Sequence, residues 1–165
     1  MGGRTLPVCE HPSGVHLFAT LRRHEQFDRL VREGEVRMIE IRIDPHPDDA
    51  ALRRLWLAAW GSGGPASFQP VLAKSLAHIG AYDGQVLVGF VNVAWDGGIH
   101  AFILDTCVDP AWQRQGIALR LLAQAAETAR VRGATWLHVD FEPHLEPLYR
   151  RAGFGPTAAG LMRLG

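Results

Sequence analysis

The sequence has few cysteines, almost no lysine and no long run of apolar residues. Among its 165 residues are two cysteines, Cys9 and Cys107, and sixteen of the seventeen basic residues are arginine. Two cysteines make no disulfide framework, and their scarcity fits the reducing cytoplasm. No apolar stretch is long enough to cross a bilayer, and the N-terminus has no signal-peptide core. These absences lead us to expect a cytoplasmic protein without a membrane span.

Several catalytic and binding motifs are absent as well. The chain has no Gly-Lys-Ser/Thr phosphate loop, no GxGxxG fingerprint and no Gly-x-Ser-x-Gly elbow. Its eight histidines form no HxxxH or HExxH pair, so we expect no bound metal. The formal net charge is zero, which removes the global electrostatic case for nucleic acid or an anionic membrane as a partner. Hydrophobic residues make up 47% of the chain, enough for the core of one compact domain.

The most informative stretch covers residues 105–120. Residues 103–108 are strand formers, and the proline that follows them would interrupt a ladder. From Ile117 onward apolar residues recur at helical spacing, and Gly133 is suited to end the helix. The start of such a helix offers unpaired N–H groups and the positive end of the macrodipole beside Gly116, which has no side chain. We expect an anion site here, and a pyrophosphate would suit it.

Strands are predicted on both sides of this stretch. Two turn signals, Asp83-Gly84 and Asp96-Gly97-Gly98, separate three apolar segments and predict an antiparallel meander. The strand after the predicted helix would lie parallel to the strand before it, through a right-handed crossover. The predicted strands are Val36–Ile43, His78–Tyr82, Gln85–Trp95, His100–Val108 and Thr135–Phe141. The sequence therefore predicts a mixed, mostly antiparallel sheet.

Helices are predicted around the meander. Asp48 or Asp49 is placed to cap a helix that runs to about residue 59, and a second helix is expected over 68–76. Trp56, Trp60 and Phe68 either line a pocket or belong to the core, and the pattern does not choose between these roles. A helix over 15–31 is also predicted, inside an N-terminal extension of residues 1–34.

The C-terminal block predicts one more helix and one more strand. Leu145, Leu148, Tyr149 and Ala152 share a helical face, and Gly153 is suited to end that helix. Leu161–Leu164 is then expected to form a final antiparallel strand.

Two motifs in this order resemble those of the GNAT N-acetyltransferase family. The first is Gln113-x-x-Gly116-x-Ala118, and the second is Leu148-Tyr149-x-x-x-Gly153-Phe154. The resemblance implies a GNAT-like domain over residues 35–165, of class α/β (α+β). It also implies a mixed, mostly antiparallel sheet flanked by helices, with a β-α-β crossover at the cofactor site.

The resemblance implies acetyl-CoA as the co-substrate. In this family the amides at the first motif hold the pyrophosphate, while backbone groups at the end of the preceding strand bind the pantetheine arm. The N–H of Val108 would polarise the thioester carbonyl. The residues expected to bind acetyl-CoA are Cys107, Val108, Gln113, Arg114, Gln115, Gly116, Ile117 and Ala118. We expect the Cys107 side chain to fill the strand and not to carry an acyl group.

Tyr149 is the expected general acid, because a neutral phenol can donate a proton to a departing thiolate. Two residues are alternatives for the general base. Asp105 lies three residues before Val108, where family members often carry an acid. Glu142 stands where an asparagine is frequent in the family, so that cofactor contact is in doubt. His100, His138 and His144 are weaker candidates, and deprotonation through water needs no dedicated base.

The function implied by the resemblance is N-acetylation of a primary amine by direct transfer in a ternary complex. The acceptor would be a small molecule or a peptide or protein amino group, and a homodimer is one arrangement common in the family. Two alternatives stay open. One is a non-catalytic acyl-CoA-binding module or sensor of the same fold, and the other is an interaction domain that binds no CoA.

Overall fold

A computed structural model describes residues 38–164 of the chain. The predicted extension of residues 1–34, with Cys9 and the predicted helix 15–31, lies outside the described residues. The same holds for the first two positions of the predicted strand 36–43.

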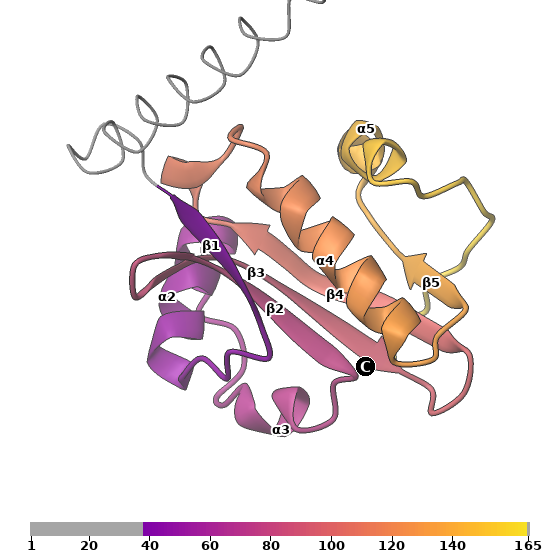
Figure 1. The fold of residues 1–165 in the computed structure, drawn as a ribbon, viewed down its shortest axis with the longest axis horizontal. Coiled ribbons are helices and arrows are strands. Elements are labelled where there is room, and N and C mark those ends of the chain that lie inside the picture. The colour runs from indigo at the N-terminus through magenta and orange to yellow at the C-terminus, as the bar shows by residue number, and fades with distance from the viewer. Residues whose placement is uncertain (1–37, 165) are drawn as a thin grey trace, which may run out of the picture. The chain divides into compact units, whose positions relative to one another are not determined.

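The centre of the fold is a five-stranded sheet in the order β1-β2-β3-β4-β5 (Figure 1). The first four strands pair antiparallel with their neighbours, and β5 runs parallel to β4. The strands are β1 (Ile39–Ile43), β2 (Ala77–Asp83), β3 (Val86–Trp95), β4 (His100–Val108) and β5 (Trp136–Val139). The predicted mixed, mostly antiparallel sheet with one parallel crossover is therefore confirmed.

Helices cover both faces of this sheet (Figure 1). The crossover helix α4 lies across one face, and the helices between β1 and β2 lie on the other. The α-helices are α2 (Asp49–Trp60), α3 (Gln69–Leu72), α4 (Ile117–Val131) and α5 (Glu146–Arg151). Two short 3-10 helices, η1 (Pro110–Trp112) and η2 (Pro143–Leu145), precede α4 and α5. In residues 38–164, no helix combines the length and the apolar character needed to cross a bilayer.

The apolar spacing of two helices explains where they pack. On α4, Leu121, Leu122 and Ala125 are buried against strand residues that include Ile79 and Val91. Because full burial of one such aliphatic side chain stabilises by about 1.5–3 kcal/mol, this face fixes α4 to the sheet.

The helix α2 begins where the sequence predicts. The Asp48 carboxylate accepts a hydrogen bond from the N–H of Ala51 at 2.7 Å, as an N-cap should. On the inner face of α2, Leu52 and Leu55 are fully buried in a second cluster, opposite the one on α4.

Three predicted elements differ in the structure, and one of them is the strand expected over Thr135–Phe141, which is limited to Trp136–Val139. The helix expected over 68–76 is limited to Gln69–Leu72, and the N–H of Ser75 donates to the Leu72 carbonyl at 3.2 Å in the turn that follows. The prediction of a strand over Leu161–Leu164 is wrong. These residues form no strand, and their apolar side chains are almost fully exposed. A strand of four residues would form few hydrogen bonds with a neighbouring strand, and these would not offset the backbone entropy lost on ordering. The sequence pattern also does not show which strand it would pair with.

Two glycines in the loop after α2 allow the cost of backbone strain to be measured apart from the cost of side-chain crowding. Gly61 and Gly64 both have positive φ, 70° and 71°. A Cβ on Gly64 would lie 2.6 Å from Trp56 and 2.7 Å from Phe68, whereas a Cβ on Gly61 meets no atom within 4 Å. We expect Gly61→Ala to cost about 1–2 kcal/mol of left-handed strain and Gly64→Ala to cost about 1–3 kcal/mol more. Urea unfolding measures the free energy of unfolding of both variants. Equal losses of stability in the two variants would contradict the crowding at Gly64.

Candidate functional site

A pocket opens where β4 and β5 separate. The two strands pair only over His100–Ile103 and Trp136–Val139. Beyond these residues β4 continues to Val108, while the chain after β5 turns away into η2. The opening holds a pocket of about 410 Å³. It is lined by Trp60, Ile103, Leu104, Asp105, Thr106, Asp140, Phe141, Glu142, Leu145, Tyr149 and Leu161.

A β-bulge lies at this opening. The register pairs Phe90 with Cys107 and Asn92 with Leu104, so two residues of β4 face one residue of β3. The two are Asp105, whose φ is 57°, and Thr106. A bulge bends a strand and redirects its side chains, and both of these residues line the pocket.

The surroundings of Asp105 change the pKa of its carboxyl group. Although Asp105 is exposed to solvent, the protein around it partly desolvates the carboxyl and raises its pKa. The side-chain amide of Asn92 opposes this effect by bonding to the ionised form and lowering the pKa. A carboxyl with a raised pKa is a better proton acceptor than one at its ordinary value.

Tyr149 is a buried residue of the pocket lining. Its side chain is 5% exposed, with the ring of Phe141 stacked at 4.6 Å and Phe154 edge-on at 5.8 Å. Burial raises the pKa of the phenol, and the hydroxyl of Thr106 lowers it in part. Within the described chain, the buried Oγ1 of Thr106 has no partner that meets full hydrogen-bond geometry. The phenol is thus protonated at neutral pH and faces a hydroxyl that retains free bonding capacity.

The structure brings the three predicted catalytic residues to one pocket. Glu142 lines it from the segment that follows β5, together with Asp140. The predicted histidine candidates do not line it: His100 and His138 bond to each other at 2.8 Å, and His138 stacks on Phe102. In the structure these two histidines form a pair on neighbouring strands.

The last residue of β4 presents its N–H to the open edge. The N–H of Asp109 donates to the carbonyl of Val88 in β3 at 2.9 Å. Since successive amides of a strand point to opposite edges, the N–H of Val108 points away from β3, to the side that β5 has left. The Val108 carbonyl on that side accepts a 3.1 Å hydrogen bond from the side-chain amide of Gln113.

This bond gives Gln113 a clear structural role. Its side chain ties the loop to the strand end, and its own N–H donates weakly to the carbonyl of Pro110 at 3.4 Å. The loop is further fixed by Asp109, whose carboxylate caps η1 by accepting from the N–H of Ala111 at 3.0 Å. Gln113 therefore shapes the loop, and the residues after it are the ones left to face a ligand.

The start of α4 has the geometry of an anion site. Gly116, the N-cap residue, has φ 79° and provides no side-chain cap, and Arg114 before it has φ 64°. The helical hydrogen bonds begin with the N–H of Arg120 on the Gly116 carbonyl at 3.1 Å, so the N–H groups of the first turn have no intrahelical partner. A Cβ on Gly116 would meet nothing within 4 Å. The space beside Gly116 is therefore open at the positive end of the helix dipole.

The Cys107 side chain lies away from the pocket. It is 5% exposed and packs in the cluster on the α2 face, which also contains Leu87 and Phe90. Burial raises the pKa of the thiol far above its usual range, with a further contribution from the charge of Asp105. A thiol that remains protonated is a poor nucleophile.

Some functional residues were not predicted from the sequence. Of the three aromatics that were expected in a pocket or in the core, Trp56 and Phe68 belong to the core and Trp60 lines the pocket. Thr106 gave no signal, because its role depends on the bulge. Asn92 could have been found, since a polar residue between Val91 and Val93 in a buried strand requires a partner.

Among residues 38–164, no group of three or more potential ligands is placed to hold a metal.

Comparison with known proteins relates this geometry to one family. The sequence profile of the Acetyltransferase (GNAT) family matches residues 36–154. A curated relative, the N-alpha-acetyltransferase RimI of Mycobacterium tuberculosis (strain ATCC 25618 / H37Rv), is 38% identical over 96 residues. That alignment covers 54% of this chain and 60% of the relative's length.

Solved structures share the fold. A GNAT family acetyltransferase from Streptococcus pneumoniae TIGR4 superimposes with a TM-score of 0.67 at 25% identity, over 78% of this chain and 98% of that one. The aminoglycoside N-acetyltransferase AAC(6')-Iy, solved in complex with CoA, superimposes with a TM-score of 0.64 at 21% identity, over 78% and 95%. With the match of the family profile over most of its length, the chain belongs to the GNAT family of acetyltransferases.

Proposed function

We propose that the protein transfers an acetyl group from acetyl-CoA to a primary amine, directly and in a ternary complex. The observation that carries this proposal is the continuity of the site. An uncapped helix start at Gly116, an open strand edge at Val108 and a pocket containing Tyr149 and Asp105 follow one another along the gap between β4 and β5.

The residues present fit acetyl-CoA. The N–H groups of residues 116–118 would hold its pyrophosphate at the start of α4, and the open edge of β4 near Val108 would hold the pantetheine arm. When bound, acetyl-CoA supplies an acetyl group activated as a thioester. Gln113, which we had also expected at the cofactor, would act by holding the loop, since its side chain is bonded to the Val108 carbonyl.

Each chemical task has a candidate group in this chain. Asp105 accepts a proton from the ammonium form of the acceptor, with Glu142 as the alternative base, so that nitrogen can attack. The Val108 N–H donates to the carbonyl oxygen, where negative charge develops. As the new C–N bond forms and the C–S bond breaks, the Tyr149 phenol donates its proton to the departing sulfur. The nitrogen loses its second proton as it becomes an amide, and a proton taken up by the Tyr149 phenolate restores the phenol.

The relatives support this chemistry at the level of the reaction. The curated relative is named an N-alpha-acetyltransferase, and one structure of the same fold is an aminoglycoside N-acetyltransferase with CoA bound. Both names describe acetyl transfer to an amine, and they name different acceptors.

Binding of acetyl-CoA tests the proposal first. A ligand that binds only the folded state stabilises it by about 2.7 kcal/mol at a hundredfold excess over Kd, so we expect the Tm to rise with acetyl-CoA. Gly116→Glu should abolish the rise by placing a carboxylate in the anion site. Gly133→Glu is the matched control, since Gly133 also has positive φ, 101°, and open space around it. If acetyl-CoA does not change the Tm of the natural protein or of either variant, the chain is an interaction domain that binds no CoA.

Replacement of the phenol tests the acid. We expect Tyr149→Phe to lower kcat by roughly 100-fold or more, the usual contribution of a positioned general acid, while the Tm shift with acetyl-CoA is retained. Tyr82→Phe is the control, because Tyr82 is the other tyrosine, is equally buried and lies beneath Arg42. CoA release at the normal rate in Tyr149→Phe would refute the assignment. Binding of acetyl-CoA without release by any amine would indicate an acyl-CoA sensor.

The pH profile of kcat/KM tests the base. Asp105 works only when ionised, so loss of activity at low pH should begin above the ordinary aspartate pKa of 3.8, because its pKa is raised. Asn92→Leu removes the amide that lowers this pKa, and the loss should then begin at a higher pH. Asp105→Asn should remove this loss of activity at low pH and lower the rate. If the loss at low pH disappears in Glu142→Gln and stays in Asp105→Asn, Glu142 is the base.

A further inference from the structure

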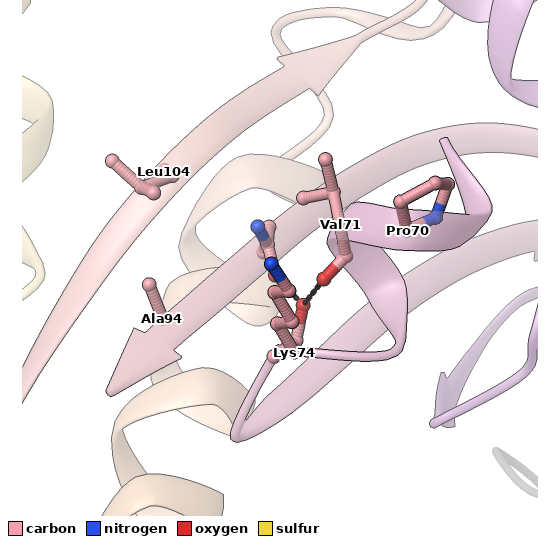
Figure 2. Close-up of a pocket in the computed structure, with 7 residues that line it drawn as sticks. Pro70, Val71, Lys74, Ala94 and Leu104 are labelled. Atoms are coloured by element: carbon pink, nitrogen blue, oxygen red, sulfur yellow. Dashed lines mark hydrogen bonds between the residues drawn. The ribbon is translucent and has the colours of Figure 1, made fainter. Parts of the chain in front are cut away.

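A second pocket lies beside the first and has no part in the chemistry described so far. It has a volume of about 300 Å³ and lies between α3, with the loop that follows it, and the strands β3 and β4. In Figure 2 the side chain of Lys74 lies between Val71 on one side and Ala94 and Leu104 on the other. The lining residues are Pro70, Val71, Lys74, Ser75, Asn92, Ala94 and Leu104.

The two pockets share a wall and carry opposite charge. Leu104 lines both of them, and 44% of its surface is exposed. Among residues 38–164, the first pocket is lined by the acidic residues Asp105, Asp140 and Glu142 and by no basic residue. Of the same described residues, Lys74 is the only charged one that lines the second pocket. An occupant that extends across Leu104 would therefore meet carboxylates at one end and an ammonium group at the other.

Lys74 is also available to a ligand. It is the only lysine of the chain and is exposed. Within the described part of the chain, its ammonium group takes part in none of the ion pairs or side-chain hydrogen bonds. The remaining lining is mostly apolar. A positive charge at the end of an apolar surface suits an anionic group that ends an apolar chain.

The wall between the pockets is held by buried polar contacts. Asn92 is 1% exposed, and its Oδ1 accepts a hydrogen bond from the Ser75 hydroxyl at 2.5 Å. The same hydroxyl lies 3.0 Å from the Val71 carbonyl (Figure 2). The amide of Asn92 also lowers the pKa of the Asp105 carboxyl, so the two side chains are near each other. One buried side chain thus connects the loop that carries Lys74 with the residue proposed to hold the amine.

We propose that the Lys74 pocket binds the far end of the acceptor, and that the acceptor is an elongated zwitterion, with an amine and a carboxylate separated by an apolar body. This inference rests on the proposed function. The amine lies at Asp105, the apolar body covers Leu104 and Ala94, and the carboxylate pairs with Lys74. An alkylamine leaves the Lys74 charge unpaired, and a diamine brings a second cation against it.

Three amines of equal chain length test the proposal: an ω-amino acid, the n-alkylamine and the α,ω-diamine, each over a series of lengths. CoA release gives kcat/KM for each. At its best length the ω-amino acid should exceed the alkylamine by about fivefold, the gain expected from one exposed ion pair, and the diamine should be the poorest. Equal values for the three amines, or the diamine as the best, would overturn the inference.

Charge reversal at Lys74 tests the same contact from the protein side. Lys74→Glu should invert the order, so that the diamine becomes better than the ω-amino acid. Arg130→Glu is the control, since Arg130 is exposed on α4 and changes the net charge equally. The order should persist in that variant, and an inversion there would refute the role of Lys74.

These outcomes separate the two proposals. If the alkylamine releases CoA and the ω-amino acid has no advantage at any length, the acetyltransferase proposal stands and the zwitterion proposal fails. If acetyl-CoA gives no Tm shift and no amine releases CoA, both proposals fail.

Discussion

The limited hydrogen bonding between β4 and β5 is the constraint on which the site depends. The two strands share four register pairs, from His100 with Trp136 to Ile103 with Val139. If pairing had continued, β5 would cover the N–H of Val108 and fill the space now lined by Asp105 and Glu142. Unpaired strand edges are usually a hazard for a folded protein, and here the open edge is the one that we propose binds the pantetheine arm.

Local patterns predicted most of the fold because each depends on neighbouring residues. The cap at Asp48, the two turns of the meander and the apolar spacing of the helix from Ile117 can each be recognised in a short stretch of sequence. Leu161–Leu164 shows the limit of that reasoning, because a short apolar stretch does not tell whether a pairing partner exists. The chain in this region is exposed and irregular.

The site was predictable only in part, for the same reason. Of the motif residues, Gly116 lies at an uncapped helix start and Tyr149 lines the pocket, and their roles toward acetyl-CoA stay predictions. The bulge that turns Asp105 and Thr106 toward the pocket depends on the register between two strands, which no single segment encodes. The contact of Asn92 with Ser75 joins residues of two elements, and only the folded chain brings them together.

The anchoring of α4 has a consequence for the thermodynamics of binding. The N–H groups at its first turn belong to a helix whose buried face, including Leu121 and Ala125, is packed against the sheet. Their orientation is therefore set when the protein folds, and the ordering entropy is not charged again to the ligand. A phosphate that binds there would need little rearrangement of the backbone. Its affinity should then depend on the integrity of the same core that stabilises the fold, so that core damage far from the ligand weakens binding before the protein unfolds.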